Sequence, residues 1–368
     1  MIKFVDLHAQ YLGIKHDVDA AIARVIRDAA FIGGPQVGEF ERDFAAYQQV
    51  KHCIGVANAT DGMEIALEAL GLPKGAEVIV PANSFIASSE AVTRTGMRVV
   101  FADIDPGTFT LSLADTERRI SPRTAAIVAV HLYGHPCDMD ALLLLARRHG
   151  LKVVEDCAQA HGADYRGRRV GAIGDVGVFS FYPGKTLGAY GDGGAIVTND
   201  EALSKRCRMI ANHGRVDKYN HEFEGRNSRL DSLQAAVLQV KLRHLDSWIA
   251  RRRAIAKRYL AGLAGLPGIV LPTVRDDVAH GYHLFVVRTS ARDALVKHLA
   301  AKQIQTGIHY PIALPKLGAY AYLGQADEPM LANQQDVRLL SLPVGEHLDD
   351  SAVDCVIAEV RAFASAAL

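Results

Sequence analysis

The chain has 368 residues, and its 41 Lys and Arg balance 41 Asp and Glu, so the formal net charge is zero. This length suits one large domain or two of medium size. A neutral chain without a long run of one charge excludes the basic surface that nucleic acid or an anionic membrane requires. We therefore expect its partners to be small molecules or other proteins.

The sequence predicts neither a signal peptide nor a membrane span. Asp6 interrupts the apolar start of the chain, and the most apolar stretch, residues 125–130, is far shorter than the roughly 20 residues that cross a bilayer. The five cysteines are spread along the chain without a Cys-x-x-Cys pair, which is typical of reduced thiols. We expect a soluble, cytoplasmic protein.

The first two thirds of the chain alternate short β-branched runs with amphipathic stretches. This pattern is typical of parallel strands joined by crossover helices, and it predicts an α/β fold with a large, mostly parallel sheet. Strands are expected at residues 52–57, 77–80, 98–102, 125–130, 152–155, 177–181 and 194–198. Helices are expected at residues 63–70, 138–149 and 201–212, where apolar residues recur at intervals of three and four.

The last third is expected to form a smaller α+β unit. Residues 231–264 keep a helical pattern with no Gly or Pro before Gly262, which predicts one long connecting helix. A strand at 284–288, a helix at 293–302 and a terminal helix from about residue 349 follow. We predict a large α/β domain over residues 48–245 and a small C-terminal domain over residues 246–368. Residues 1–47 would pack with the small domain or with a partner subunit.

A glycine-rich loop with a single lysine follows the strand at 177–181. Gly184-Lys185-Thr186 is similar to the end of a phosphate-binding P-loop, but the first glycine of that motif would stand at position 179, where the chain has Phe. No helix-forming run follows Thr186 either, which disfavours a phosphotransferase. A lysine in such a loop can instead condense with an aldehyde to form an imine, and Lys185 is the candidate for that chemistry.

Two further segments supply groups that an aldehyde cofactor would need. Asp156 follows the strand at 152–155, at the edge where open α/β sheets bind ligands. A carboxylate there can keep a pyridine nitrogen protonated, as pyridoxal phosphate (PLP) requires, although for Asp156 taken alone a helix cap or an ion pair is the better explanation. Thr60 and Asp61 lie where the chain enters a helix. Either is an expected N-cap, and the free N–H groups of such a start can bind phosphate.

Two other groups of residues receive no functional role. Imidazole and thiolate are zinc ligands, and candidates of these types are His131, His135, Cys137, Cys157 and His161. His131 follows a strand and therefore does not share a helix face with His135, and no compact Cys/His pairs occur, so we expect no metal site. The basic cluster Arg251-Arg252-Arg253 is interpreted as the solvated face of a helix.

Four segments together resemble a known family. They are Asn58-Ala59-Thr60-Asp61, Glu155-Asp156-Cys157-Ala158-Gln159-Ala160, Ser180-Phe181-Tyr182-Pro183-Gly184-Lys185 and residues 225–236, which begin Gly-Arg-Asn-Ser-Arg-Leu-Asp. In this order they resemble the sugar aminotransferases of the DegT/DnrJ/EryC1/StrS family, and the likeness extends from residues 33–37 to residues 309–311. The resemblance implies a fold type I PLP-dependent transferase, similar to aspartate aminotransferase. Lys185 would hold the cofactor covalently, and Asp156 would face its ring nitrogen.

The resemblance also implies the other residues around the cofactor and the substrate. The further cofactor-binding residues would be Gln159 near the ring hydroxyl, Phe85 over the ring face, Thr60, Asp61 and Ser180 at the phosphate, and Asn227 reaching the phosphate from the neighbouring subunit. A homodimer with shared active sites follows. The residues expected near the acceptor are Tyr182, Arg229, His309 and Tyr310.

The reaction implied by the resemblance is amino transfer, because a dehydratase branch of the family has histidine at the Lys185 position. Glutamate is the expected donor and a nucleotide-linked keto sugar the acceptor. Residues 181–188 are similar to the loop of members that aminate C3 ketones, which favours a dTDP-linked 3-keto-6-deoxyhexose. The product would serve deoxyamino-sugar biosynthesis, for example of an O-antigen or another glycan. A UDP-linked 3-keto sugar, a 4-keto sugar and a noncatalytic regulatory protein remain open.

Overall fold

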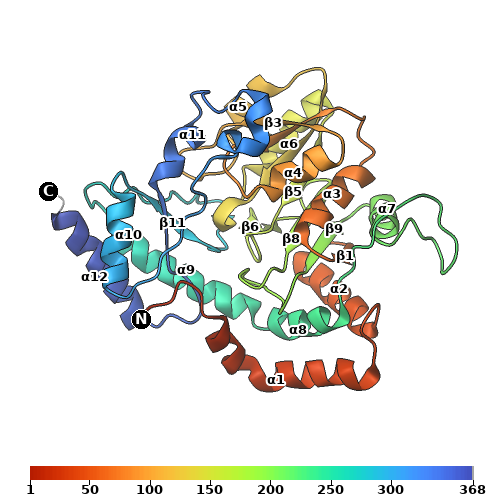
Figure 1. The fold of residues 1–368 in the computed structure, drawn as a ribbon, viewed down its shortest axis with the longest axis horizontal. Helices are drawn as coiled ribbons and strands as arrows, with labels where there is room; N and C mark the ends of the chain where they lie inside the picture. The colour runs from red at the N-terminus through yellow and green to blue at the C-terminus, as the bar shows by residue number, and fades with distance from the viewer. Residues whose placement is uncertain (367–368) are drawn as a thin grey trace.

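The structure, a computed structural model, describes residues 1–366. Its centre is a seven-stranded sheet with the strand order β1-β9-β8-β5-β4-β2-β3 (Figure 1). These strands are β1 (His52–Val56), β2 (Glu77–Pro81), β3 (Arg98–Ala102), β4 (Thr124–Val130), β5 (Lys152–Asp156), β8 (Val176–Ser180) and β9 (Gly194–Thr198). Each begins and ends within one residue of its predicted bounds, because short runs of Val, Ile and Ala mark strands that are buried on both faces. The predicted α/β fold is confirmed.

One strand of this sheet runs against the other six. β9 pairs antiparallel with both β8 and β1, whereas the other neighbouring strands are parallel. The expected alternation of parallel strands with crossover helices is therefore wrong at this step. Residues 181–193, all of them described, connect β8 to β9 without a helix, and a chain that returns without a crossover runs antiparallel. This connection carries Lys185.

Helices cover both faces of the sheet. The apolar side chains of α3, α4 and α7 pack on one face, and those of α2, α6 and α8 pack on the other. The helices are α1 (Leu7–Asp28), α2 (Pro35–Gln48), α3 (Ala59–Ala69), α4 (Ala87–Arg94), α5 (Leu113–Arg119), α6 (Met139–His149), α7 (Glu201–Ala211), α8 (Ser232–Leu242), α9 (Leu245–Gly262), α10 (Arg292–Ala301), α11 (Leu331–Gln335) and α12 (Asp350–Ala366). Short 3-10 turns occupy Leu132–Gly134, Leu314–Lys316, Gly318–Leu323 and Asp336–Arg338. The predicted helices correspond to α3, α6 and α7.

The connecting helix predicted over residues 231–264 is two helices. α8 ends at Leu242 and α9 begins at Leu245, and the N–H of His244 bonds to the carbonyl of Lys241 in the turn between them. The two helices bury their apolar sides against different partners, since α8 packs on α1 and α2 whereas α9 packs on α12. This change of direction depends on tertiary partners, so a helical pattern without Gly or Pro does not reveal it.

The C-terminal part of the chain has its own core. β11 (Phe285–Arg288) pairs antiparallel with β12 (Leu339–Leu342), and apolar residues of α9, α10 and α12 pack together with this pair. A further small sheet has the order β10-β6-β7, formed by β10 (Val278–Ala279), β6 (Asp164–Tyr165) and β7 (Arg168–Arg169). The division of the chain at residue 245 stays a prediction.

The N-terminal segment contacts several parts of the fold. Ile2 forms a backbone bridge with Ile304, which places the start of the chain beside the C-terminal core (Figure 1). α1 then runs along α8 at the lower edge of Figure 1, and α2 packs on both α8 and β1. Residues 1–47 therefore contact both the C-terminal core, through Ile2, and the central sheet, through α2.

The basic cluster on α9 is not the expected solvated face. Arg252 is 6% exposed and donates hydrogen bonds to the carbonyl oxygens of Tyr282 and Val344. Buried carbonyl groups in irregular segments need such donors, so Arg252 ties α9 to two loops of the C-terminal core. Among residues 1–366, no helix has the length and apolar character that a bilayer crossing requires.

Candidate active site

A cavity of about 640 Å³ lies at the carboxyl ends of the central strands. Val130, Asp156 and Ser180 are the last residues of β4, β5 and β8, and all three line it. This is the edge at which open α/β sheets bind ligands. The predicted site residues that line the cavity are Thr60, Phe85, Asp156, Gln159, Ser180, Tyr182, Lys185, His309 and Tyr310. The structure thus brings most of the candidates together from distant parts of the chain.

Lys185 lies in the connection between β8 and β9. Its N–H bonds to the carbonyl of Tyr182 at 2.8 Å, and a Cβ at Gly188 would lie 2.4 Å from the carbonyl oxygen of Pro183, so this tight turn requires glycine. Burial lowers the pKa of the Lys185 amine to about 8, and the negative charge of Asp156 counteracts only part of that effect. A lysine with a lowered pKa supplies the neutral amine that imine formation needs.

Asp156 is held on both of its carboxylate oxygens. The Ser88 hydroxyl donates a 2.6 Å hydrogen bond to Oδ2, and the backbone N–H of Ala158 donates a 3.1 Å bond to Oδ1. Among residues 1–366, Asp156 caps no helix and forms no salt bridge, so neither alternative explanation of this residue applies. Its place at the cavity wall leaves it available to a ligand.

The start of α3 faces the same cavity. Asn58, and not Thr60 or Asp61, is the N-cap, because its side-chain oxygen accepts a 2.8 Å bond from the N–H of Asp61. The expected cap was wrong because the helix begins earlier than its apolar pattern shows. Ala59 and Thr60 line the cavity, and their N–H groups have no acceptor among the described residues. Gly194 allows β9 to approach, since a Cβ there would lie 2.6 Å from the carbonyl carbon of Asn58. This helix start can bind an anion.

Gln159 and Tyr310, which both line the cavity, are joined by a hydrogen bond. Nε2 of Gln159 donates to the Tyr310 hydroxyl at 2.8 Å, and Oε1 accepts from the N–H of Tyr133 at 2.7 Å. The ring centroids of Tyr310 and Phe85 are 5.8 Å apart. Burial raises the pKa of Tyr310, so this phenol is neutral. Tyr310, expected beside the acceptor, therefore lies with Gln159 and Phe85, both expected beside the cofactor.

Histidines form the wall on the side of the C-terminal core. His309 stacks on Phe4 with ring centroids 5.7 Å apart, and its Nδ1 lies 2.8 Å from the Ser341 hydroxyl. Burial, and then the charge of Lys185, lower the pKa of His309 to about 4. The pKa of His283 is lowered for the same reasons. Both imidazoles are therefore neutral at pH 7. Sequence reasoning missed Phe4 and His283, which lie far from His309 in the chain.

The three remaining candidates do not line the cavity of their own chain. Asp61 lies in the first turn of α3, and Arg229 is half-buried before α8. Asn227 is exposed, and its backbone forms a bridge with Asn212. It does not cap α8, whose N-cap is Asp231, so the simplest alternative explanation of Asn227 does not apply.

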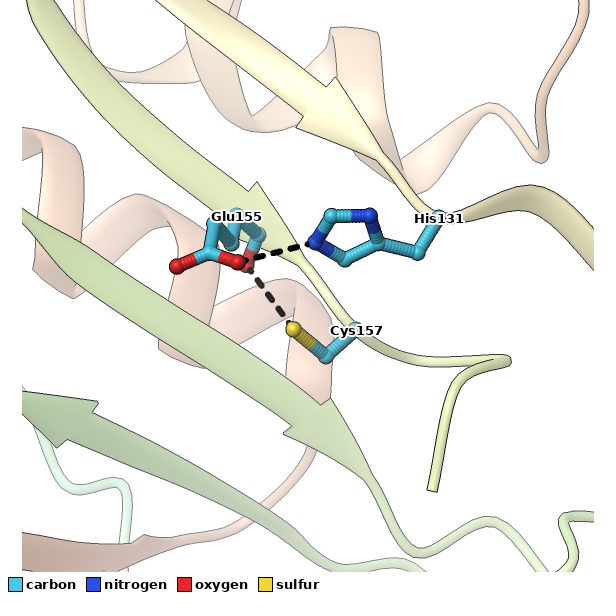
Figure 2. A group of neighbouring side chains, drawn as sticks. All are labelled: His131, Glu155 and Cys157. Carbon is cyan, nitrogen blue, oxygen red and sulfur yellow. Dashed lines mark hydrogen bonds and ion pairs between the residues drawn. The ribbon is translucent and has the colours of Figure 1, made fainter. Parts of the chain in front are cut away.

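A buried group of potential metal ligands lies where the ends of β4 and β5 are side by side (Figure 2). The ligand atoms of His131, Glu155 and Cys157 lie within 4.8 Å of one another. Sequence spacing did not show this group because it forms across neighbouring strands. The carboxylate of Glu155, however, already accepts four hydrogen bonds, from Nε2 of His131 and from the N–H groups of Gly171, Ile173 and Gly174.

These bonds explain the group without a metal ion. Nδ1 of His131 accepts a hydrogen bond from the N–H of Cys137 at 3.0 Å, so the ring proton is on Nε2. Nε2 then donates a hydrogen bond to the carboxylate of Glu155 at 2.9 Å. Burial raises the pKa of Glu155, but the bonds from His131 and the backbone lower it further than burial raises it. Glu155 is thus an ionised anchor for residues 171–174. The prediction that the protein has no metal site stays a prediction.

The groups around the cavity fit PLP. The amine of Lys185 suits its aldehyde, the carboxylate of Asp156 its ring nitrogen, and the start of α3 its phosphate. Fold and site together define the class of α/β enzymes that hold an aldehyde cofactor through a lysine. Residues 13–361 match the DegT/DnrJ/EryC1/StrS aminotransferase family, and the chain belongs to it.

Relatives of known activity cover nearly the whole chain. The chain is 49% identical over 364 residues to the dTDP-3-amino-3,4,6-trideoxy-alpha-D-glucose transaminase of Streptomyces venezuelae. The aligned residues make up 99% of this chain and 96% of that protein. It is 45% identical over 363 residues to the dTDP-3-amino-3,6-dideoxy-alpha-D-galactopyranose transaminase of Aneurinibacillus thermoaerophilus, with 99% of each covered.

Solved structures of relatives share the fold. DesV of S. venezuelae, solved in complex with a ketimine intermediate, has a TM-score of 0.96 and 49% identity, covering 99% of this chain and 98% of that one. NtdA of Bacillus subtilis, solved with bound pyridoxamine phosphate, has a TM-score of 0.90 and 31% identity, covering 96% of this chain and 82% of that one. The predicted family, aminotransferase activity and PLP-type cofactor are confirmed.

Proposed function

We propose that this aminotransferase moves an amino group from glutamate to C3 of a dTDP-linked 3-keto-6-deoxyhexose. The observation that carries the chemistry is the Lys185 amine, which has a pKa near 8 and shares a cavity with Asp156. The acceptor is supported by the two relatives at 49% and 45% identity, both named for dTDP-3-amino sugars. The loop that resembles those of C3-aminating members, residues 181–188, includes this lysine.

The cofactor, when bound, supplies an electron sink that makes a proton on the neighbouring substrate carbon removable. Lys185 would attach the cofactor through its amine and, once displaced by substrate, would act as the base that takes that proton and as the acid that gives it back. Asp156 holds the ring nitrogen in its protonated form. These two residues are the proposed catalytic pair.

The other cofactor-binding residues are proposed to position these groups. Thr60, Asp61 and Ser180 bind the phosphate at the start of α3, where the free N–H groups and the helix dipole favour an anion. Gln159 bonds to the ring hydroxyl, and the exposed ring of Phe85, 54% accessible, covers the cofactor ring.

The acceptor is proposed to lie against Tyr182, Arg229, His309 and Tyr310. Tyr182, His309 and Tyr310 line the cavity, which supports this proposal. A homodimer would bring Asn227 of one chain to the phosphate of the other, and the exposure of Asn227 in a single chain agrees with that role. Nucleotide-sugar synthesis of this kind would take place in the cytoplasm.

An amino-transfer assay against a panel of keto sugars tests the substrate. The purified protein, PLP and 15N-glutamate are incubated with dTDP-3-keto, UDP-3-keto and dTDP-4-keto sugars, and label transfer is measured by mass spectrometry. We expect the highest kcat/KM with the dTDP-3-keto sugar. Higher activity on either other sugar would change the assigned acceptor. No transfer to any sugar, by protein that binds PLP, would favour a regulatory role.

A further inference from the structure

Two serines connect Asp156 to the cavity by a chain of hydrogen bonds. The Ser88 hydroxyl donates to Oδ2 of Asp156 at 2.6 Å, and its oxygen lies 2.7 Å from Oγ of Ser84. Ser84 is 4% exposed and Ser88 is 1% exposed, and both line the cavity together with Asp156. The chain therefore reaches the proposed catalytic carboxylate directly and is shielded from bulk water.

The direction of this chain follows from the charge of Asp156. An ionised carboxylate only accepts hydrogen bonds, so the single proton of Ser88 points to Asp156. Ser88 then accepts, and the proton of Ser84 points to Ser88. The oxygen of Ser84 can therefore only accept hydrogen bonds from groups in the cavity. This favours a hydrogen-bond donor beside Ser84 and disfavours binding of an anion there.

The remaining support of Asp156 comes from the backbone. Oδ1 accepts only the longer, 3.1 Å bond from the N–H of Ala158, two residues along the chain. Ser88 is thus the one side chain among the described residues that bonds to this carboxylate. A hydrogen bond to a charged acceptor is stronger than one between neutral groups, so its loss would free the carboxylate to rotate.

We infer that Ser84 and Ser88 form a positioning relay that keeps the carboxylate of Asp156 aimed at the ring nitrogen of the cofactor. This inference rests on the proposed role of Asp156. Neither serine needs to touch the substrate. The relay therefore acts on cofactor binding and on the chemical step, and it leaves the KM for the acceptor unchanged.

The matched variants Ser88→Thr and Ser88→Val test the relay. Threonine keeps the hydroxyl, and valine replaces it with a methyl group of similar size, so the added bulk is the same in both. Ser89→Ala is the control, because Ser89 is fully buried on the same helix and bonds to Ile86 and Tyr320 but not to Asp156. The affinity of each apoprotein for PLP is measured by absorbance titration, and its unfolding by calorimetry without PLP.

We expect Ser88→Val to bind PLP about tenfold or more weakly than Ser88→Thr, with the same unfolding temperature for the two apoproteins. Its kcat should fall, and the acceptor KM should stay within twofold. Ser84→Ala should show a smaller loss, and Ser89→Ala should bind PLP as the wild type does. Equal PLP affinity and kcat in Ser88→Thr and Ser88→Val would overturn the relay.

Two further outcomes are distinguishable. If the bulkier variants do not fold, Ser88→Ala is compared with Ser89→Ala, and equal PLP affinities would again overturn the relay. If the wild-type protein binds no PLP, the proposed role of Asp156 fails, and the relay fails with it. Failure of the relay alone leaves PLP binding by the wild type intact.

Discussion

Lys185 and Asp156 face the same cavity with opposite charges, yet the carboxylate does not keep the lysine fully charged. Asp156 raises the pKa of Lys185, and burial lowers it by more, so the pKa is about 8 instead of the usual 10.5. A partly dry cavity disfavours a charged amine unless a close partner replaces the lost hydration. The site therefore supplies a neutral amine at lower pH than an exposed lysine would.

Lys185→Ala should abolish amino transfer while leaving the fold intact. The side chain lies in a loop outside the packed strands and helices, and its loss removes both the covalent link and the proton carrier. Turnover should fall by at least about a hundredfold, the scale of a lost general acid and base. Steady-state assays with glutamate measure the loss, and Lys205→Ala, an exposed lysine of α7, is the control. Turnover within about tenfold of the wild type would exclude Lys185 from catalysis.

The capture of PLP by the apoprotein should depend on pH with a midpoint near 8. Only the neutral amine attacks an aldehyde, so the rate constant should rise as pH passes the lowered pKa of Lys185 and level off above it. Asp156→Asn should move this midpoint to lower pH, because the charge of Asp156 raises the lysine pKa. Borohydride trapping at a series of pH values measures the rate. A midpoint near 10.5 would show that the lysine is hydrated in the apoprotein.

Much of the fold could be predicted because its signals are local. The seven central strands are short runs of apolar residues. Asp156 ends one of these runs and Lys185 follows another, so the sequence alone places both residues at the ends of strands. The reversal of β9 also has a local signal, because no helix-forming run follows Thr186. A connection without a crossover helix indicates an antiparallel return, so the expectation of parallel strands joined by crossover helices fails at this step.

Other parts of the site depend on contacts that no local pattern reveals. Ser88 and Asp156 are 68 residues apart and meet only because α4 packs beside the end of β5. His131 and Glu155 are 24 residues apart and meet because β4 and β5 are neighbours. The charge of Arg252 predicts an exposed side chain. Its burial is explained only by the carbonyl groups to which it donates, and these lie on distant segments. These side chains pair across elements, so their roles required the structure.

Asp156→Asn should keep the geometry of the site and slow both halves of the reaction. The N–H of Ala158 would hold the amide oxygen in place of Oδ1, and the amide nitrogen could donate to Ser88, so folding should be preserved. An amide cannot balance a protonated ring nitrogen, which weakens the electron sink. Single-turnover rates with glutamate and with the keto sugar should both fall by about tenfold or more. Unchanged rates would remove Asp156 from the mechanism.

The position of Asn227 makes a prediction about the assembly. It is exposed, caps no helix and lies outside the cavity of its own chain, which agrees with a role at the phosphate of a partner. In a dimer with two-fold symmetry each chain would then complete the other's site. Asn227→Asp places a negative charge near that phosphate and should inactivate the homodimer. Asn199→Asp adds the same charge to an exposed residue at the far end of β9 and should leave activity unchanged.

Mixed dimers of two inactive chains test the shared site directly. When Lys185→Ala chains are combined with Asn227→Asp chains, a heterodimer holds both lesions in one site and none in the other. Its activity should recover to about half of the wild-type value per dimer, since one of two equivalent sites is intact. Differently tagged chains allow heterodimers to be purified and assayed separately. If each site were built from a single chain, every site of the heterodimer would carry one lesion and no activity would return.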